Sequence, residues 1–179
     1  MPYQYIRSFD KSVAGVVAHL PDSTQGFLKS ISIVGGSVFA VIALLVIAII
    51  AITTNNHSLL TVTLLVLVFT PLAEASKFIT RRKRPETLYA QSMKFKSYSF
   101  PSGHSYVSAL MASYITLLAF TYLSAPFSLG ISILFIVLSF IVGVSRIYLG
   151  AHFPSDVFAG WGFGVLVMFL INILSKVFI

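Results

Sequence analysis

The sequence has no cysteine, and only 9% of its residues are charged. The absence of cysteine excludes thiol catalysis, disulfide bonds and cysteine-ligated metals, and it leaves the redox compartment undetermined. A soluble domain usually carries about a quarter charged residues, so this chain has too little polar surface to cover a water-exposed globule. Acidic residues are the scarcest charge: five Asp and Glu stand against 12 Lys and Arg. The resulting formal charge of +7 favours an anionic partner.

Apolar residues make up 57% of the 179 positions and gather in five long segments. These segments cover approximately residues 31–53, 59–79, 104–123, 127–144 and 153–178. Each is close to the ~20 residues that a helix needs to cross a bilayer. In lipid the backbone must bond internally, which favours helices over open strands. The alternative, buried helices of a soluble protein, lacks the polar sequence that would surround them. The sequence therefore predicts an all-α, multi-pass transmembrane bundle, with residues 1–179 forming one domain.

The first 30 residues differ from the rest of the chain. Asp10 and Lys11 interrupt them, so they do not fit a signal peptide. Apolar side chains from Ile6 to Leu20 recur at helical spacing, which indicates an amphipathic helix lying at the membrane interface. Residues 21–26 form a polar break. With this segment included, we expect five to six membrane helices.

Polar residues from distant parts of the chain are predicted to meet on one membrane face. If the helices alternate in direction, the ends of the second and fourth segments lie beside the starts of the third and fifth. An ordinary positively charged face accounts for Arg81, Arg82 and Lys83. It does not account for two histidines and an aspartate at the same place. Since these cations gather at a membrane face, we predict an anionic lipid partner and no nucleic acid.

Two of the polar clusters offer phosphate contacts. Lys77 and Arg84 are seven residues apart, about two helical turns, so both can face one side. Ser102 is a plausible helix N-cap, Gly103 allows close backbone approach, and amides at a helix start bind anions. His104 follows in the first turn. Snorkelling cations and a capped helix with an interfacial histidine are the alternatives for these clusters. Glu74 is expected to pair with Lys77 or Arg146.

The third cluster contains Arg146, His152 and Asp156. His152 and Asp156 are four residues apart across a predicted helix start, a spacing at which a carboxylate can reach a ring nitrogen. The carboxylate would fix the tautomer and leave the other nitrogen free to attack. A helix-capping acid beside an uninvolved histidine is the alternative.

Together the clusters permit phosphoryl transfer without a metal ion. Phosphoryl transfer requires charge neutralisation and alignment, and the cations Lys77, Arg84 and Arg146 can supply the charge. Carboxylates are too few for a convincing two-metal centre. We predict that His152 attacks phosphorus and that His104 protonates the departing oxygen and then activates water. No cofactor is expected.

The three clusters resemble the signature of the type-2 phosphatidic acid phosphatase family, which reads K-x6-RP, PSGH and SR-x5-H-x3-D. Residues 77–85, 101–104 and 145–156 match it without a departure. The resemblance implies His152 as nucleophile, His104 as general acid and Asp156 as orienting residue. It also implies phosphate contacts from Lys77, Arg84, Ser102, Gly103 and Arg146, and a helical core shared with vanadium haloperoxidases. Members in membranes commonly have six crossings.

The expected function is therefore hydrolysis of a lipid phosphate or diphosphate. Undecaprenyl diphosphate, phosphatidylglycerol phosphate and phosphatidic acid are the candidate substrates, with the first two favoured by analogy. The alternatives are a phosphotransferase with a lipid or sugar acceptor, and a non-enzymatic transporter or scaffold for anionic lipids. The positive-inside tendency would place the basic face in the cytoplasm. The resemblance implies instead an extracytoplasmic site in a bacterial cell membrane. The sequence leaves the oligomeric state undetermined.

Overall fold

The structure is a computed structural model that describes residues 2–93 and 97–178. Regular secondary structure in these ranges is entirely helical, which confirms the predicted all-α class. The elements in chain order are α1 (Pro2–Ala18), the short 3₁₀ helix η1 (Asp22–Thr24), α2 (Gln25–Val34), α3 (Ser37–Thr53), α4 (His57–Phe69), α5 (Leu72–Thr80), α6 (Leu88–Ser92), α7 (Gly103–Tyr122), α8 (Ala125–Tyr148) and α9 (Pro154–Phe178).

Within the described residues, four stretches are long and apolar enough to cross a membrane. They are His57–Thr80, Gly103–Tyr122, Ala125–Tyr148 and Pro154–Val177. A fifth span results if the bent pair formed by Asp22–Val34 and Ser37–Thr53 crosses as one unit. Many large apolar side chains on these helices point outward, among them Ile49, Phe140 and Phe169, each at least half exposed. Such a surface suits lipid and not water. The protein is an integral membrane protein with several spans.

The first apolar segment is not the single helix that hydropathy predicts. It divides at Gly35 and Gly36, and α2 and α3 meet there at 46°. Both glycines lie at close approaches: a Cβ atom on Gly35 would collide with the side chain of Val142 in α8. A Cβ atom on Gly36 would lie 3.3 Å from Nε2 of His104. The break therefore allows the chain to pass close to α8 and to the first turn of α7. A milder interruption separates α4 from α5 at Pro71, which has no N–H to donate, and His57–Thr80 still counts as one span.

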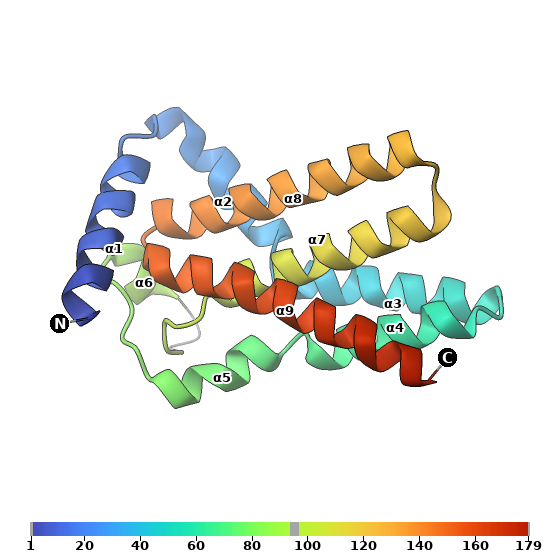
Figure 1. The fold of residues 1–179 in the computed structure, drawn as a ribbon. Coiled ribbons are helices and arrows are strands. Elements are labelled where there is room, and N and C mark those ends of the chain that lie inside the picture. The colour runs from blue at the N-terminus through green and yellow to red at the C-terminus, as the bar shows by residue number, and fades with distance from the viewer. Residues whose placement is uncertain (1, 94–96, 179) are drawn as a thin grey trace.

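Helix α1 crosses the end of the bundle, where α8 ends and α9 begins (Figure 1). Its amphipathic character is confirmed in part, because Val17 packs with Ile147 and Val157 while Val16 stays exposed. Phe9 makes an edge-to-face contact with Phe158. Its position at a membrane interface stays a prediction.

Helix α7 forms the centre of the bundle, between α8 on one side and α9 on the other. Its side chains Tyr106, Leu110 and Tyr114 are fully buried. Close packing against α9 depends on Gly160 and Gly164, where an added Cβ would meet backbone atoms of the α7 region. Small residues at this spacing commonly allow helices in membranes to pack closely. This packing holds the first turn of α7 beside the first turn of α9, and both turns contribute to the candidate site.

Candidate active site

His152 lies in the short turn between α8 and α9 and is 3% exposed. The backbone N–H groups of Ala151 and His152 both donate to the carbonyl of Arg146, at 3.0 and 3.3 Å. Gly150 adopts φ +66° in this turn, a conformation that favours glycine. Thr87 is the N-cap residue of α6. It fixes the same turn, because its hydroxyl donates to the Gly150 carbonyl over 2.8 Å. These bonds fix the backbone of the turn that carries the imidazole.

The two ring nitrogens of His152 have different neighbours. Nε2 is 3.1 Å from Nη1 of Arg84. Because arginine has donors only, Nε2 must accept this hydrogen bond, which places the proton of the neutral ring on Nδ1. Burial lowers the pKa of His152 to about 4, and the charges of Arg84 and Arg146 act in the same direction. Asp156 offsets part of this shift. The ring is therefore neutral at pH 7, with a lone pair on Nε2.

Asp156 is fully buried at the start of α9, next to the His152 ring. Its Oδ2 atom is 3.5 Å from Nδ1 of His152, longer than a normal hydrogen bond. The carboxylate is held instead by the Ser99 hydroxyl, by the Phe153 amide at 2.9 Å and by Arg82 Nη1 at 2.7 Å. The predicted pair is brought together, but the direct bond is not formed in this structure, and Nδ1 has no hydrogen-bond partner among the described residues. The orienting role of Asp156 stays a prediction.

Three predicted cations surround this turn. Arg84 donates to the Ala151 and Ser97 carbonyls, each over 2.9 Å. Burial, and then the charge of Arg146, lower the pKa of the Arg84 guanidinium below its ordinary value. Arg146 is 2% exposed at the end of α8, donates to Ser32 of α2, and leaves Nε without a partner among the described residues. Its unpaired donor can serve a ligand.

Lys77, on α5, is 2% exposed and donates to Glu74 over 2.6 Å. Of the two pairings expected for Glu74, the structure forms the one with Lys77. Lys77 and Arg84 also share Ser97, whose hydroxyl accepts from both, at 3.4 and 3.1 Å. The two cations that sequence spacing placed on one side therefore meet at one side chain.

His104 and its neighbours enter from the start of α7. Ser102 is the N-cap residue, as predicted, and its hydroxyl accepts from the Ser105 amide. A Cβ atom on Gly103 would collide with Glu74 and lie 3.7 Å from Nζ of Lys77, so the backbone here is next to the cation. The His104 ring is within electrostatic reach of Arg146, His152, Lys77 and Arg84. The structure therefore gathers all eight predicted site residues at one end of the bundle.

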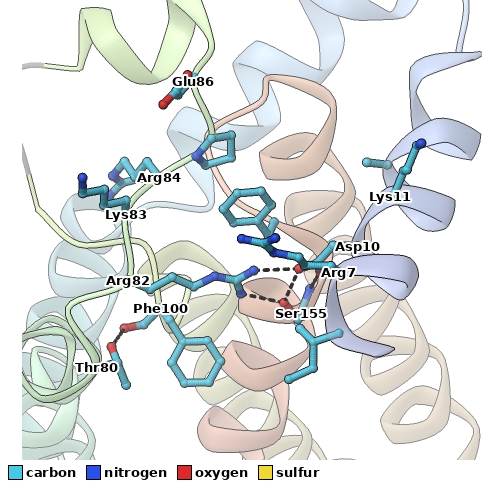
Figure 2. Close-up of a pocket in the computed structure, with 14 residues that line it drawn as sticks. Arg7, Asp10, Lys11, Thr80, Arg82, Lys83, Arg84, Glu86, Phe100 and Ser155 are labelled. Atoms are coloured by element: carbon cyan, nitrogen blue, oxygen red, sulfur yellow. Dashed lines mark hydrogen bonds and ion pairs between the residues drawn. The ribbon is translucent and has the colours of Figure 1, made fainter. Parts of the chain in front are cut away.

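Two charged residues of this region were not expected to belong to the site. Arg82 was interpreted as an ordinary cation of a positive membrane face, and this interpretation did not foresee its two ion pairs. Its guanidinium bridges Asp156 to Asp10 of α1, each at 2.7 Å. Figure 2 shows the contact with Asp10. Asp10 is 5% exposed on a helix whose neighbouring side chains are mostly exposed. The one available signal was an acidic residue in a chain with only five.

A cavity of about 930 Å³ lies between α1 and residues 80–86. Figure 2 shows Arg82 extending toward Asp10 and Ser155, with Lys83 and Lys11 on opposite sides of the cavity. Arg84 also lines it, so the cavity adjoins the turn that carries His152.

The model of the PAP2 superfamily matches residues 39–178. Phosphatidylglycerophosphatase B of Bacillus subtilis is 37% identical over 95 residues, which are 51% of this chain and 45% of that protein. An undecaprenyl-diphosphatase of Sulfolobus acidocaldarius is 37% identical over 103 residues, 55% of this chain and 46% of that protein. The chain therefore matches less than half the length of either relative.

Two solved structures have the same fold. The crystal structure of a transmembrane PAP2 type phosphatidylglycerolphosphate phosphatase from Bacillus subtilis has a TM-score of 0.80 and 26% identity. It covers 96% of this chain, and this chain covers 87% of it. The crystal structure of Aquifex aeolicus LpxE has a TM-score of 0.67 at 20% identity, covering 90% of this chain and 93% of that one. The similarity to the second structure supports the fold alone.

Proposed function

This chain belongs to the PAP2 superfamily, and we propose that it hydrolyses a membrane lipid phosphate or diphosphate through a phosphohistidine on His152, without a metal ion. The observation that carries the proposal is the 3.1 Å contact between Nε2 of His152 and Nη1 of Arg84, in which Nε2 accepts and therefore carries a lone pair. A nucleophile must be unprotonated at its attacking atom, and its neighbours must neutralise the phosphate that it attacks.

The phosphate is proposed to bind between the cations and the start of α7. Lys77, Arg84 and Arg146 come from three separate segments and supply positive charge. Ser102 and Gly103 contribute the helix start, where backbone amides bind anions. A phosphate oxygen would take the place of His152 Nε2 on Arg84 and free the ring nitrogen for attack. The unpartnered Nε of Arg146 is a further donor for the same group.

The reaction then has two steps. Nε2 of His152 forms a bond to phosphorus, and the bond from phosphorus to the leaving oxygen breaks. His104 gives its proton to that oxygen, so the lipid leaves as an alcohol or a monophosphate. A water molecule next attacks the phosphohistidine, His104 takes its proton, and the bond between phosphorus and Nε2 breaks. Inorganic phosphate leaves, and both histidines return to their starting protonation. Asp156 steadies the positive charge that His152 carries between the steps.

An apolar cavity of about 300 Å³ supports a lipid substrate. It is lined by α2, α3, α7 and α8 and reaches Gly36, the residue beside His104. An acyl or isoprenoid tail can lie here while the phosphate reaches the cations. Phosphatidylglycerol phosphate and undecaprenyl diphosphate are the favoured substrates, since two relatives are named for them. Phosphatidic acid is the third candidate.

We place the site on the extracytoplasmic face of a bacterial cell membrane. Several of the cations that the positive-inside tendency counts are engaged at the site, which weakens that tendency here. A single cysteine in place of the exposed Gln91 tests this placement. Labelling of intact cells by an impermeant maleimide supports it, and labelling only after lysis contradicts it.

Phosphate release in detergent tests the function. The purified protein is offered each of the three lipids with EDTA present, and His152→Ala is the matched inactive variant. We expect release by the wild type alone, in EDTA. Release that needs a divalent metal, or that persists in the variant, contradicts the proposal. Added glycerol or sugar separates hydrolysis from phosphotransfer, because a transferase would yield a phosphorylated acceptor.

A further inference from the structure

We propose that Asp10 and Arg82 are positioning residues for the reaction, so that docking of α1 completes the active site. This inference rests on the proposed function, since the group that they position is the turn carrying His152. Neither residue is a specified position of the three motifs, since Arg82 is one of the six variable residues between Lys77 and Arg84. Both also lie outside the predicted phosphate contacts.

Asp10 joins α1 to the start of α9. Its Oδ1 accepts from the Ser155 amide over 2.8 Å, and its Oδ2 accepts from the Ser155 hydroxyl over 3.0 Å. The amides in the first turn of a helix have no acceptor within that helix. Asp10 therefore acts as an N-terminal cap for α9, although it lies 145 positions away along the chain. A carboxylate at this place is also favoured by the helix dipole.

Arg82 connects this cap to the residues that follow His152. Its Nη1 donates to the Ser155 hydroxyl and to Asp156, both over 2.7 Å, and its Nη2 donates to Asp10. Its guanidinium carbon also lies 4.3 Å from the centre of the Phe153 ring. One planar group thus contacts three of the four residues after His152. A lysine cannot reproduce this arrangement, because its single ammonium lacks the planar fork.

The backbone around Arg82 is also fixed. Arg81 before it adopts a left-handed conformation that ends α5, and the Arg82 carbonyl accepts from the Ser99 amide over 2.7 Å. The Ser99 hydroxyl in turn donates to Asp156. Arg82 therefore contacts one carboxylate oxygen of Asp156, and Ser99 contacts the other.

Charge explains why this arrangement matters to His152. Asp156 is fully buried beside a neutral imidazole, and Arg82 is the cation in direct contact with it. A buried carboxylate without a paired cation is unfavourable. Arg82 satisfies two carboxylates at once, so loss of Asp10 would free it to move and would loosen the Asp156 carboxylate. A displaced carboxylate can no longer stabilise the charged His152 in its attacking orientation.

The test compares Asp10→Asn and Arg82→Lys with Asp22→Asn and Arg81→Lys. The two control positions carry the same residue types and are exposed. Turnover of a lipid phosphate in detergent gives kcat and KM, and melting in the same detergent reports the fold. We expect Asp10→Asn to lower kcat about tenfold with little change in KM, as loss of a group that orients a reactive one does. Asp10→Glu should recover part of the loss, and the controls should match the wild type.

A double-mutant cycle tests whether Asp10 acts through Arg82. The double variant Asp10→Asn/Arg82→Lys should be no slower than Arg82→Lys alone, because coupled residues are not additive. Additive losses, a wild-type kcat for Asp10→Asn, or a rise in KM alone would overturn the proposal. If Arg82→Lys does not fold, Ser155→Ala takes its place in the cycle, since it removes the hydroxyl between the two charges.

A readout without substrate separates this inference from the proposed function. Diethylpyrocarbonate modifies neutral imidazoles, and mass spectrometry gives the rate at His152. We expect faster modification in Asp10→Asn than in Asp22→Asn, because release of α1 exposes the turn. Equal rates in the two variants would overturn the positioning role even if no lipid is hydrolysed. Absence of hydrolysis by the wild type would contradict the function alone.

Discussion

Arg84 Nη1 lies 3.1 Å from His152 Nε2, the atom that attacks phosphorus in the proposed reaction. The same guanidinium holds the carbonyls of Ser97 and Ala151, so it fixes the loop before α7 and the turn before α9 together. Arg84 thus donates a hydrogen bond to the nucleophilic nitrogen of His152. A bound phosphate would replace that nitrogen as the acceptor of the Arg84 hydrogen bond.

Arg84→Lys should therefore lower kcat, because an ammonium cannot hold both carbonyls and the phosphate at once. We expect a loss of about 100-fold, the effect of removing one donor that stabilises transition-state charge. Steady-state kinetics with a lipid phosphate measures it, with the exposed Arg81→Lys as control. A variant as fast as the control would remove Arg84 from the mechanism.

Acid should destabilise the folded protein through His152. Its folded pKa of about 4 lies below the ordinary histidine value, so between about pH 6.5 and 4 the unfolded chain binds the additional proton. The contribution of His152 to the free energy of unfolding is thus fully present above that pH window, and it is lost as the pH falls through the window. The loss is expected to approach about 3 kcal/mol. The melting temperatures of the wild type and of His152→Gln, measured in detergent from pH 7.5 to 4.5, should converge as the pH falls. Parallel curves would show that His152 does not titrate in this way.

Gly103→Ala should disturb the phosphate site through Glu74. The added methyl group would meet the Glu74 carboxylate that holds Lys77. We expect a fall in kcat/KM of about tenfold, the usual cost of displacing a supporting group. Glu74→Ala in the same chain should restore part of the loss by making room. Gly162→Ala, which meets open space, is the control. No recovery in the double variant would mean that the collision lies elsewhere.

How far the sequence predicts this molecule depends on which interactions are local or carried by a motif. Helix positions from His104 onward were predicted closely, because long apolar segments have few alternatives in lipid. The break at Gly35 and Gly36 was not predicted, because a hydropathy pattern carries no information about the close approach of Val142 and His104. PAP2 membership itself was indicated by the three motifs and is confirmed by the family match.

At the site, too, contacts within a motif were predicted and contacts between distant residues were not. Motif spacing placed the imidazole of His152 near Asp156, but it could not show the 3.5 Å gap between them. The contacts of Arg82 with Asp10 and Asp156 span 72 and 74 positions, and no local pattern carries such pairings. Arg82 also stands between Arg81 and Lys83, both exposed, which made it resemble a surface cation.

The apolar cavity gives a prediction on substrate tails. Met111→Trp would fill space between α3, α7 and α8 and should compete with a long tail. We expect kcat/KM for a long-chain lipid phosphate to fall about tenfold relative to a short-chain one, within the range for filling an apolar pocket. Val137→Trp on the outer face of α8 is the control. An equal effect on both substrates would place the tail elsewhere.

The covalent step can be observed directly. After rapid quenching of the wild type with a lipid phosphate, mass spectrometry under alkaline conditions should find phosphate on His152, since phosphohistidine is lost in acid. The phosphate should be on Nε2, the nitrogen that meets Arg84. Phosphate on another residue, or phosphate release at full rate with no labelled histidine at any quench time, would contradict the account.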